Sequence, residues 1–227
     1  MTIGVINWGL ALDSFPVLLQ GAKITLQFTV VSVFFGMILG LIFALGRMSK
    51  NKIIKFLSAA YIDFFRGTPL LVQIFLIYFG IPQLIPFTLP DNYQYIAGAI
   101  ALSLNCGAYT AEIFRSGIQS IDYGQAEAAR SLGMSHFQSM RYIILPQAFK
   151  VVVPPLGNEF IAMLKDSSLL AIIAIEDLMY TGKIIAGRTF QALPIFMMVA
   201  VMYLAMTMAL SMLVNYTEKR LSKSDNG

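Results

Sequence analysis

Long apolar runs without charge restrict the fold of this chain more than any other feature. Residues 24–45 and 193–216 contain no charged side chain at all. A helix needs about 20 mostly apolar residues to cross the ~30 Å hydrocarbon core of a bilayer. Only 12% of the 227 residues are charged and 57% are hydrophobic, whereas about 25% are charged in soluble globular proteins. The sequence therefore predicts an all-α integral membrane protein whose surface is largely covered by lipid.

We expect five membrane-spanning segments, and two of them are irregular. The second is interrupted by Asp63, Arg66 and Pro69. The fourth is short, carries Glu159 and begins at Pro154-Pro155. The spans are predicted at about residues 24–45, 56–81, 95–118, 151–164 and 193–216.

Three shorter segments complete the predicted topology. Ser167 to Ile175 is apolar but only nine residues long, so it is expected to be a buried or re-entrant piece. A more polar helix follows at about residues 176–189, and residues 13–21 are expected to lie along the outer interface.

The basic residues are unevenly divided between the connections. Residues 82–94 contain no Lys or Arg. The opposite side carries most of them: Arg47, Lys50, Lys52, Lys55, Arg130, Arg141, Lys150, Lys219, Arg220 and Lys223. The positive-inside rule then predicts an N-terminus outside the cell and a C-terminus in the cytoplasm, which agrees with an odd number of spans. We expect one transmembrane domain over residues 1–227, with its core at about 21–220 and a cytoplasmic loop at about 119–150.

The cytoplasmic loop contains a spaced pattern of small and apolar residues. Glu127-Ala128-Ala129 is followed after three residues by Gly133, and after nine more by Ile143, Ile144 and Leu145-Pro146. The first part predicts a short helix that ends near the glycine. A second helical run at about 136–144 is expected to lead back into the membrane.

This pattern resembles the loop signature of binding-protein-dependent ABC importer permeases. The segments Arg66–Leu70, Gly107–Glu112, Gly157–Phe160 and Leu164–Leu169 are similar to the polar amino acid branch, which carries histidine, arginine, glutamine or cystine. The resemblance implies a type I importer permease fold with five helices and a cytoplasmic coupling helix, in a multi-pass protein of the bacterial cytoplasmic membrane.

The same resemblance implies a set of partners. They are a second permease subunit, identical or related, an ABC ATPase dimer on the cytoplasmic face, and a solute-binding protein outside. ATP and Mg²⁺ are expected on the ATPase, so this chain is expected to bind no cofactor or metal and to catalyse no reaction. Docking to the ATPase is assigned by resemblance to Glu127, Ala128, Ala129, Arg130, Leu132 and Gly133.

Ionisable residues within spans mark a possible substrate cavity, because charge at membrane depth is costly and usually functional. Glu112 and Glu159 are the acidic candidates for holding a substrate cation. The polar candidates beside them are Thr68, Asn105, Tyr109 and Asn158. Alternatively, Glu112 forms an ion pair with Arg115, and Glu159 pairs with Lys165 or contacts another subunit.

Asp63 and Arg66 lie three residues apart near the predicted inner end of the second span. They are expected to form a structural ion pair, and the turn from Arg66 to Pro69 is expected to break the helix.

Alternative functions are less well supported by the sequence. An enzyme is disfavoured, because Gly182-Lys183 is followed by Ile184 rather than by the Ser or Thr of a phosphate-binding loop, and the chain has one histidine. The sequence has no basic helix face of the kind that binds nucleic acid, so nucleic-acid binding is not expected. The remaining alternative is a self-sufficient secondary transporter or channel.

Overall fold

The computed structural model describes residues 6–84, 86 and 88–223, with side chains described as far as Arg220. Residues 1–5 and 224–227 of the expected domain lie outside the described residues. None of the described residues is in a strand. The elements are α1 (Trp8–Asp13), α2 (Phe15–Arg47), α3 (Lys52–Gly67), α4 (Leu70–Phe75), η1 (Leu76–Gly80), η2 (Ile81–Leu84), α5 (Tyr93–Gln119), α6 (Tyr123–Ser131), α7 (His136–Ser139), η3 (Met140–Ile144), α8 (Leu145–Asp166), η4 (Ser167–Ile173), α9 (Leu178–Thr189) and α10 (Ala192–Lys223).

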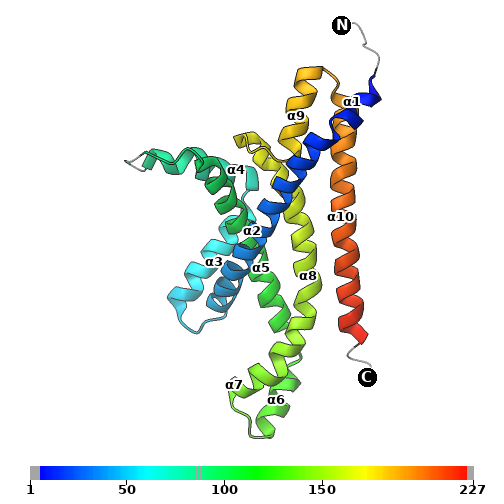
Figure 1. Cartoon of the computed structure of the whole chain (residues 1–227). Coiled ribbons are helices and arrows are strands. Elements are labelled where there is room, and N and C mark those ends of the chain that lie inside the picture. Colours follow the sequence, from blue (N-terminus) through cyan, green and yellow to red (C-terminus); the bar gives the residue numbers. More distant parts are fainter. Residues whose placement is uncertain (1–5, 85, 87, 224–227) are drawn as a thin grey trace.

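The spans are long helices that run between two ends of the molecule (Figure 1). α2, α5 and α10 are each long and apolar enough to cross a bilayer, and α3 together with the stretch Leu70–Leu84 is apolar enough for a fourth, sharply bent span. α8 is more polar, but its 22 residues extend about 33 Å at 1.5 Å per residue, which is enough to cross. α1 lies at one end of the molecule, and α10 runs from that end towards the end that carries the α6–α7 loop (Figure 1).

Small residues hold α2 and α5 together at the centre. The backbones approach so closely that a Cβ atom added to Gly36 would lie 2.6 Å from the Sγ atom of Cys106. Thr110 donates its hydroxyl proton to the carbonyl oxygen of Gly36 at 3.0 Å. Membrane helices associate through such close packing and hydrogen bonds, because lipid supplies no hydrophobic force between them. The α2–α5 pair is therefore the rigid centre of the chain.

Two predicted boundaries are wrong. Residues 15–21 are not a separate interfacial segment, because the chain turns at Ser14 and α2 then runs unbroken from Phe15, with Pro16 in its first turn. The fourth span does not begin at Pro154-Pro155. α8 begins at Leu145, and both prolines lie inside it.

The short piece after α8 is buried, as predicted. It forms the 3-10 helix η4, which ends at Ala174 in the left-handed conformation (φ 60°). Leu170 and Ile175 pack against α5 at Gly98, where an added Cβ atom would lie 2.8 Å from Ile175. The polar helix predicted after it is α9.

Candidate functional site

The α6 helix has a defined start and a defined end. The Asp122 carboxylate accepts a hydrogen bond from the Gly124 amide at 2.6 Å and caps the N-terminus. At the other end, Gly133 has a φ of 77°, which favours glycine. The Gly133 amide donates to Arg130 O at 2.9 Å, and the Met134 amide donates to Ala129 O at 3.1 Å. These two bonds form a Schellman cap, so Gly133 is required by the way the helix ends.

The second arm of the loop is continuous with α8. Ser135 and Gln138 form a reciprocal capping box at the start of α7. α7 continues as the π-helix η3 and then directly as α8, and α6 packs against η3. The loop is therefore mounted on α8, so a push on α6 reaches the membrane through that helix.

Five of the six residues predicted to dock are exposed, and one is not. Glu127, Ala128, Arg130 and Gly133 are exposed, and Leu132 is 81% exposed. Ala129 is fully buried inside the loop, so it stabilises the loop rather than offering a docking surface.

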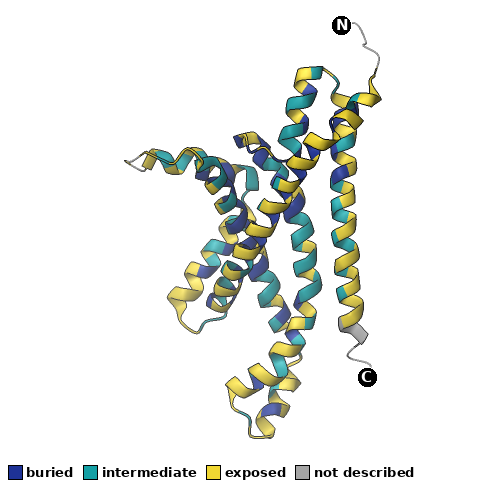
Figure 2. Cartoon of the chain, in the orientation of Figure 1, coloured by how far each residue is buried: buried dark blue, intermediate teal, exposed yellow. Residues whose placement is uncertain are grey.

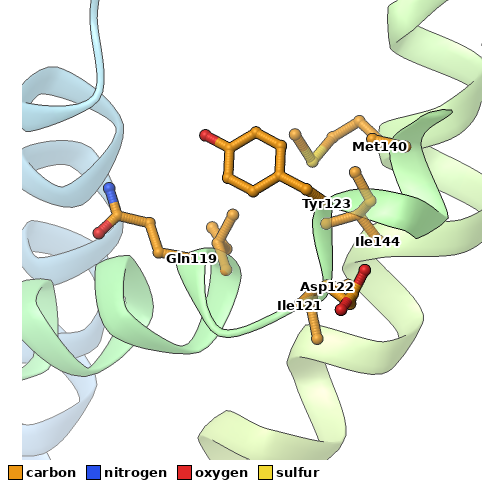
Figure 3. A pocket seen from close by; sticks show the side chains of 8 residues that line it. Gln119, Ile121, Asp122, Tyr123, Met140 and Ile144 are labelled. Atoms are coloured by element: carbon orange, nitrogen blue, oxygen red, sulfur yellow. The ribbon is translucent and has the colours of Figure 1, made fainter.

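Sequence reasoning missed two aromatic residues on this loop. Tyr123 is 84% exposed and Phe137 is 70% exposed. Tyr123 stands at the edge of a hollow of about 440 Å³ between the end of α5, α6 and η3 (Figure 3). The hollow is lined by Ile118, Gln119, Ile121, Asp122, Tyr123, Ala126, Met140 and Ile144. An aromatic residue next to a helix cap in a polar loop was the available signal. Figure 2 shows that the loop is mostly exposed.

Charged groups gather where α2, α3 and α5 meet. Glu112 accepts a hydrogen bond from Arg115 Nε at 3.0 Å, which confirms the predicted ion pair. Arg47 lies 3.9 Å from the same carboxylate and 3.1 Å from Asp63. The predicted pair of Asp63 with Arg66 is wrong, because the end of α2 brings Arg47 to Asp63.

Arg66 instead lies over an aromatic ring. Its guanidinium carbon is 5.5 Å from the ring centroid of Tyr109. Arg66, which was not among the predicted cavity residues, thus lies against one of them, Tyr109.

The other predicted cavity residues are placed differently. Asn105 is buried and donates its amide to Gln73 Oε1 at 2.9 Å. Thr68 donates its hydroxyl proton to Phe64 O at 2.8 Å. On α8, Asn158 is exposed and Glu159 is half-buried. Tyr109, with Arg66 over its ring, and Glu112 thus lie three residues apart on α5, whereas Asn105 and Thr68 bind groups at the break between α3 and α4.

The fold and the exposed loop define a membrane-embedded transport subunit of the type I importer class. A family model described as "binding-protein-dependent transport system inner membrane component" matches residues 36–223. The chain belongs to this family. It is accordingly a multi-pass protein of the cytoplasmic membrane, of a kind that works with an ATPase and a binding protein.

Relatives and solved structures agree with this assignment. The chain is 41% identical over 218 residues to the "probable glutamine ABC transporter permease protein GlnM" of Bacillus subtilis strain 168, covering 96% of this chain and 99% of that one. It is 40% identical over 230 residues to the "L-cystine transport system permease protein TcyB" of the same strain, covering 98% and 95%. A crystal structure of "an amino acid ABC transporter with histidines" contains a chain that is 42% identical, with a TM-score of 0.90 and coverage of 96% and 100%.

Proposed function

We propose that this chain forms the membrane path of an ABC importer for a polar amino acid and is moved by separate ATPase subunits. The observation that carries the proposal is the α6 helix, which is capped at both ends and is mostly exposed. Its second half and the glycine turn, residues 127–133, are called the knob below. Relatives named for glutamine and cystine support the substrate class.

Coupling follows from how the knob is mounted. An ATPase cleft that grips Glu127, Ala128, Arg130, Leu132 and Gly133 moves α6 as one piece, because the Schellman cap fixes its end. The movement passes through η3 into α8. In this proposal ATP and Mg²⁺ are bound by the ATPase, and this chain binds neither and catalyses no reaction. The knob and the C-terminus face the cytoplasm, and the N-terminus faces outside.

The path is proposed along the faces of α3, α5 and α8 that carry Arg66, Tyr109, Glu112 and Glu159. A second permease subunit completes it, and a solute-binding protein delivers the amino acid from outside. Rocking of the two subunits then opens the path to each side in turn.

The experiment is reconstitution of this chain in liposomes with its ATPase and binding protein. We expect uptake of labelled glutamine, cystine, arginine or histidine only when ATP, ATPase and binding protein are all present. Uptake driven by an ion gradient without the ATPase would show that the chain is a secondary transporter.

The cavity has its own test in the double variant Glu112→Gln, Glu159→Gln. Loss of these two carboxylates is expected to raise the KM for a cationic substrate about tenfold, as for a lost charge-assisted contact of ~1.4 kcal/mol. The matched control is Glu176→Gln, because Glu176 is exposed ahead of α9. An unchanged KM and an unchanged substrate order would remove these residues from the path.

A further inference from the structure

The second span is broken near its middle. α3 ends at Gly67 and α4 begins at Leu70. The chain bends by 109° between α3 and the stretch Leu70–Leu84. Thr68 and Pro69 between them are extended. A break frees backbone carbonyl oxygens from the helix, and within a membrane no water replaces the lost partners. These oxygens therefore need donors from the protein itself.

One side chain, Gln73, supplies donors to two of these carbonyl oxygens. Gln73 is 1% exposed, and its Nε2 atom lies 2.8 Å from Phe65 O, 3.0 Å from Thr68 O and 2.9 Å from Thr68 Oγ1. Its Oε1 atom accepts a hydrogen bond from Asn105 Nδ2 at 2.9 Å. The Gln73 carboxamide, which belongs to α4, thus binds the end of α3 on one side and α5 on the other.

The hydrogen-bonded side chains of Gln73 and Asn105, called the clamp below, lie next to Arg66. Arg66 lies between Phe65 and Thr68, the two residues whose carbonyl oxygens Gln73 holds. Tyr109, under the Arg66 guanidinium, lies one helical turn from Asn105 on α5. The same amide pair that fixes the bend therefore fixes the position of Arg66 relative to α5.

We propose that Gln73 is a positioning residue for translocation: acting through Asn105 and the carbonyl oxygens of the break, it sets the α3–α4 bend and holds Arg66 over Tyr109. The inference rests on the proposed function in one respect, that this face lines the path. A merely structural role for Gln73 predicts lower stability alone, whereas positioning predicts a changed bend and changed uptake in protein that still folds.

The bend is measured in the complete complex by electron spin resonance between nitroxides at Phe56→Cys on α3 and Phe79→Cys on η1. Both side chains are exposed, and the native Cys106 is buried away from the label. Gln73→Leu removes the donors and the acceptor, and Gln73→Asn, which keeps an amide, shortens its reach by one methylene. The matched control is Gln83→Leu, the same change at an exposed residue on η2. The rescue variant, Gln73→Asn with Asn105→Gln, returns the missing methylene from the α5 side.

We expect one narrow distance in the unmodified chain and in Gln83→Leu, and a broad or shifted distance in Gln73→Leu and Gln73→Asn. Uptake is expected to fall about tenfold in both Gln73 variants, equivalent to ~1.4 kcal/mol, because Arg66 loses its fixed position when the carbonyl oxygens of the break lose their donors. The rescue variant is expected to recover much of both signals. If Gln73→Leu does not fold, Gln73→Asn alone carries the test.

An unchanged distance in Gln73→Asn would overturn the proposal, and so would a changed distance with unchanged uptake. The distance is measured without transport. A complex that shows the expected distances but imports no amino acid would therefore count against the proposed function and not against the clamp.

Discussion

The α2–α5 pair and the α6–α7 loop solve opposite packing problems. Between α2 and α5 the interface is filled within one chain, and Ala44, Cys106, Ala108 and Ala111 are fully buried there. Between Tyr123 and Ile144, all of which the structure describes, only Ala129 and Ser139 are buried. Large apolar side chains on the loop, Leu132 above all, remain uncovered. The difference shows that the α2–α5 interface is filled within this chain, whereas the loop leaves apolar side chains uncovered, as the proposed docking requires.

The sharpest contrast comes from enlarging a glycine in the body. Gly36→Leu places a side chain where Cys106 Sγ would lie 2.6 Å from the Cβ atom alone. Such overpacking costs roughly 1–3 kcal/mol or more, so we expect loss of folded protein from the membrane. Yield and monodispersity in detergent measure it. Gly187→Leu is the control, because nothing lies within 4 Å of an added Cβ atom there; equal yields of the two variants would contradict the tight seam.

In the loop, enlarging a glycine is expected to spare the fold and stop transport. Nothing lies within 4 Å of a Cβ atom added to Gly133, although its φ of 77° strains any residue with a Cβ atom. Aspartate tolerates left-handed backbone better than most residues, so Gly133→Asp is expected to fold with a loss of about 1 kcal/mol and a melting temperature lower by a few degrees. ATP-driven uptake in liposomes is expected to fall at least about tenfold, a coupling loss of ~1.4 kcal/mol, because the added charge meets the ATPase. Gly187→Asp serves as the control, and normal uptake by Gly133→Asp would refute docking at this residue.

A smaller effect is expected from the ion pairs at the inner end of the body. Arg47→Met removes the contacts with Asp63 and Glu112. Partly exposed pairs contribute about 0–1 kcal/mol, so the melting temperature is expected to fall by only a few degrees. Lys52→Met at the exposed start of α3 is the comparison. A collapse of yield as complete as that of Gly36→Leu would mean that this cluster, and not the glycine seam, holds the body together.

The smallest expected change is a gain. Ala174 has a φ of 60°, a conformation that costs a residue with a Cβ atom roughly 1 kcal/mol. Ala174→Gly is expected to raise stability by about 0.5 kcal/mol after the greater chain entropy of glycine is subtracted. Thermal unfolding in detergent measures it, beside Ala171→Gly within η4, which is expected to destabilise. A loss of stability in Ala174→Gly would show that the methyl group packs usefully.

The sequence was sufficient for the long elements and for the loop. Uncharged runs locate α2 and α10 because only burial in lipid tolerates them, and the spacing from Glu127 to Pro146 locates both arms of the loop. Pro154-Pro155 misled the prediction of α8, because a proline pair was taken as a helix start although Pro146 already occupies that role.

Partners that are distant in sequence were not predictable. Spacing of three residues favours Asp63 with Arg66, but the end of α2 delivers Arg47 to Asp63 instead. Asn105 reads as a cavity residue until Gln73 is seen to occupy its amide. In the loop, helical periodicity did not identify Ala129 as buried, because α7 and η3, the elements that pack against α6, follow the glycine turn.

The central claim is that the knob at residues 127–133 binds a separate ATPase. It is tested most directly by placing a photo-crosslinking amino acid, p-benzoylphenylalanine, at Leu132 or at Phe190 in the assembled transporter. Both residues are apolar and exposed, at 81% and 92%. Leu132 follows α6 and Phe190 follows α9, and these helices lie at opposite ends of the molecule (Figure 1). The account predicts a crosslink to the ATPase from position 132 and none from position 190. A crosslink from position 190, or its absence from position 132, would contradict it.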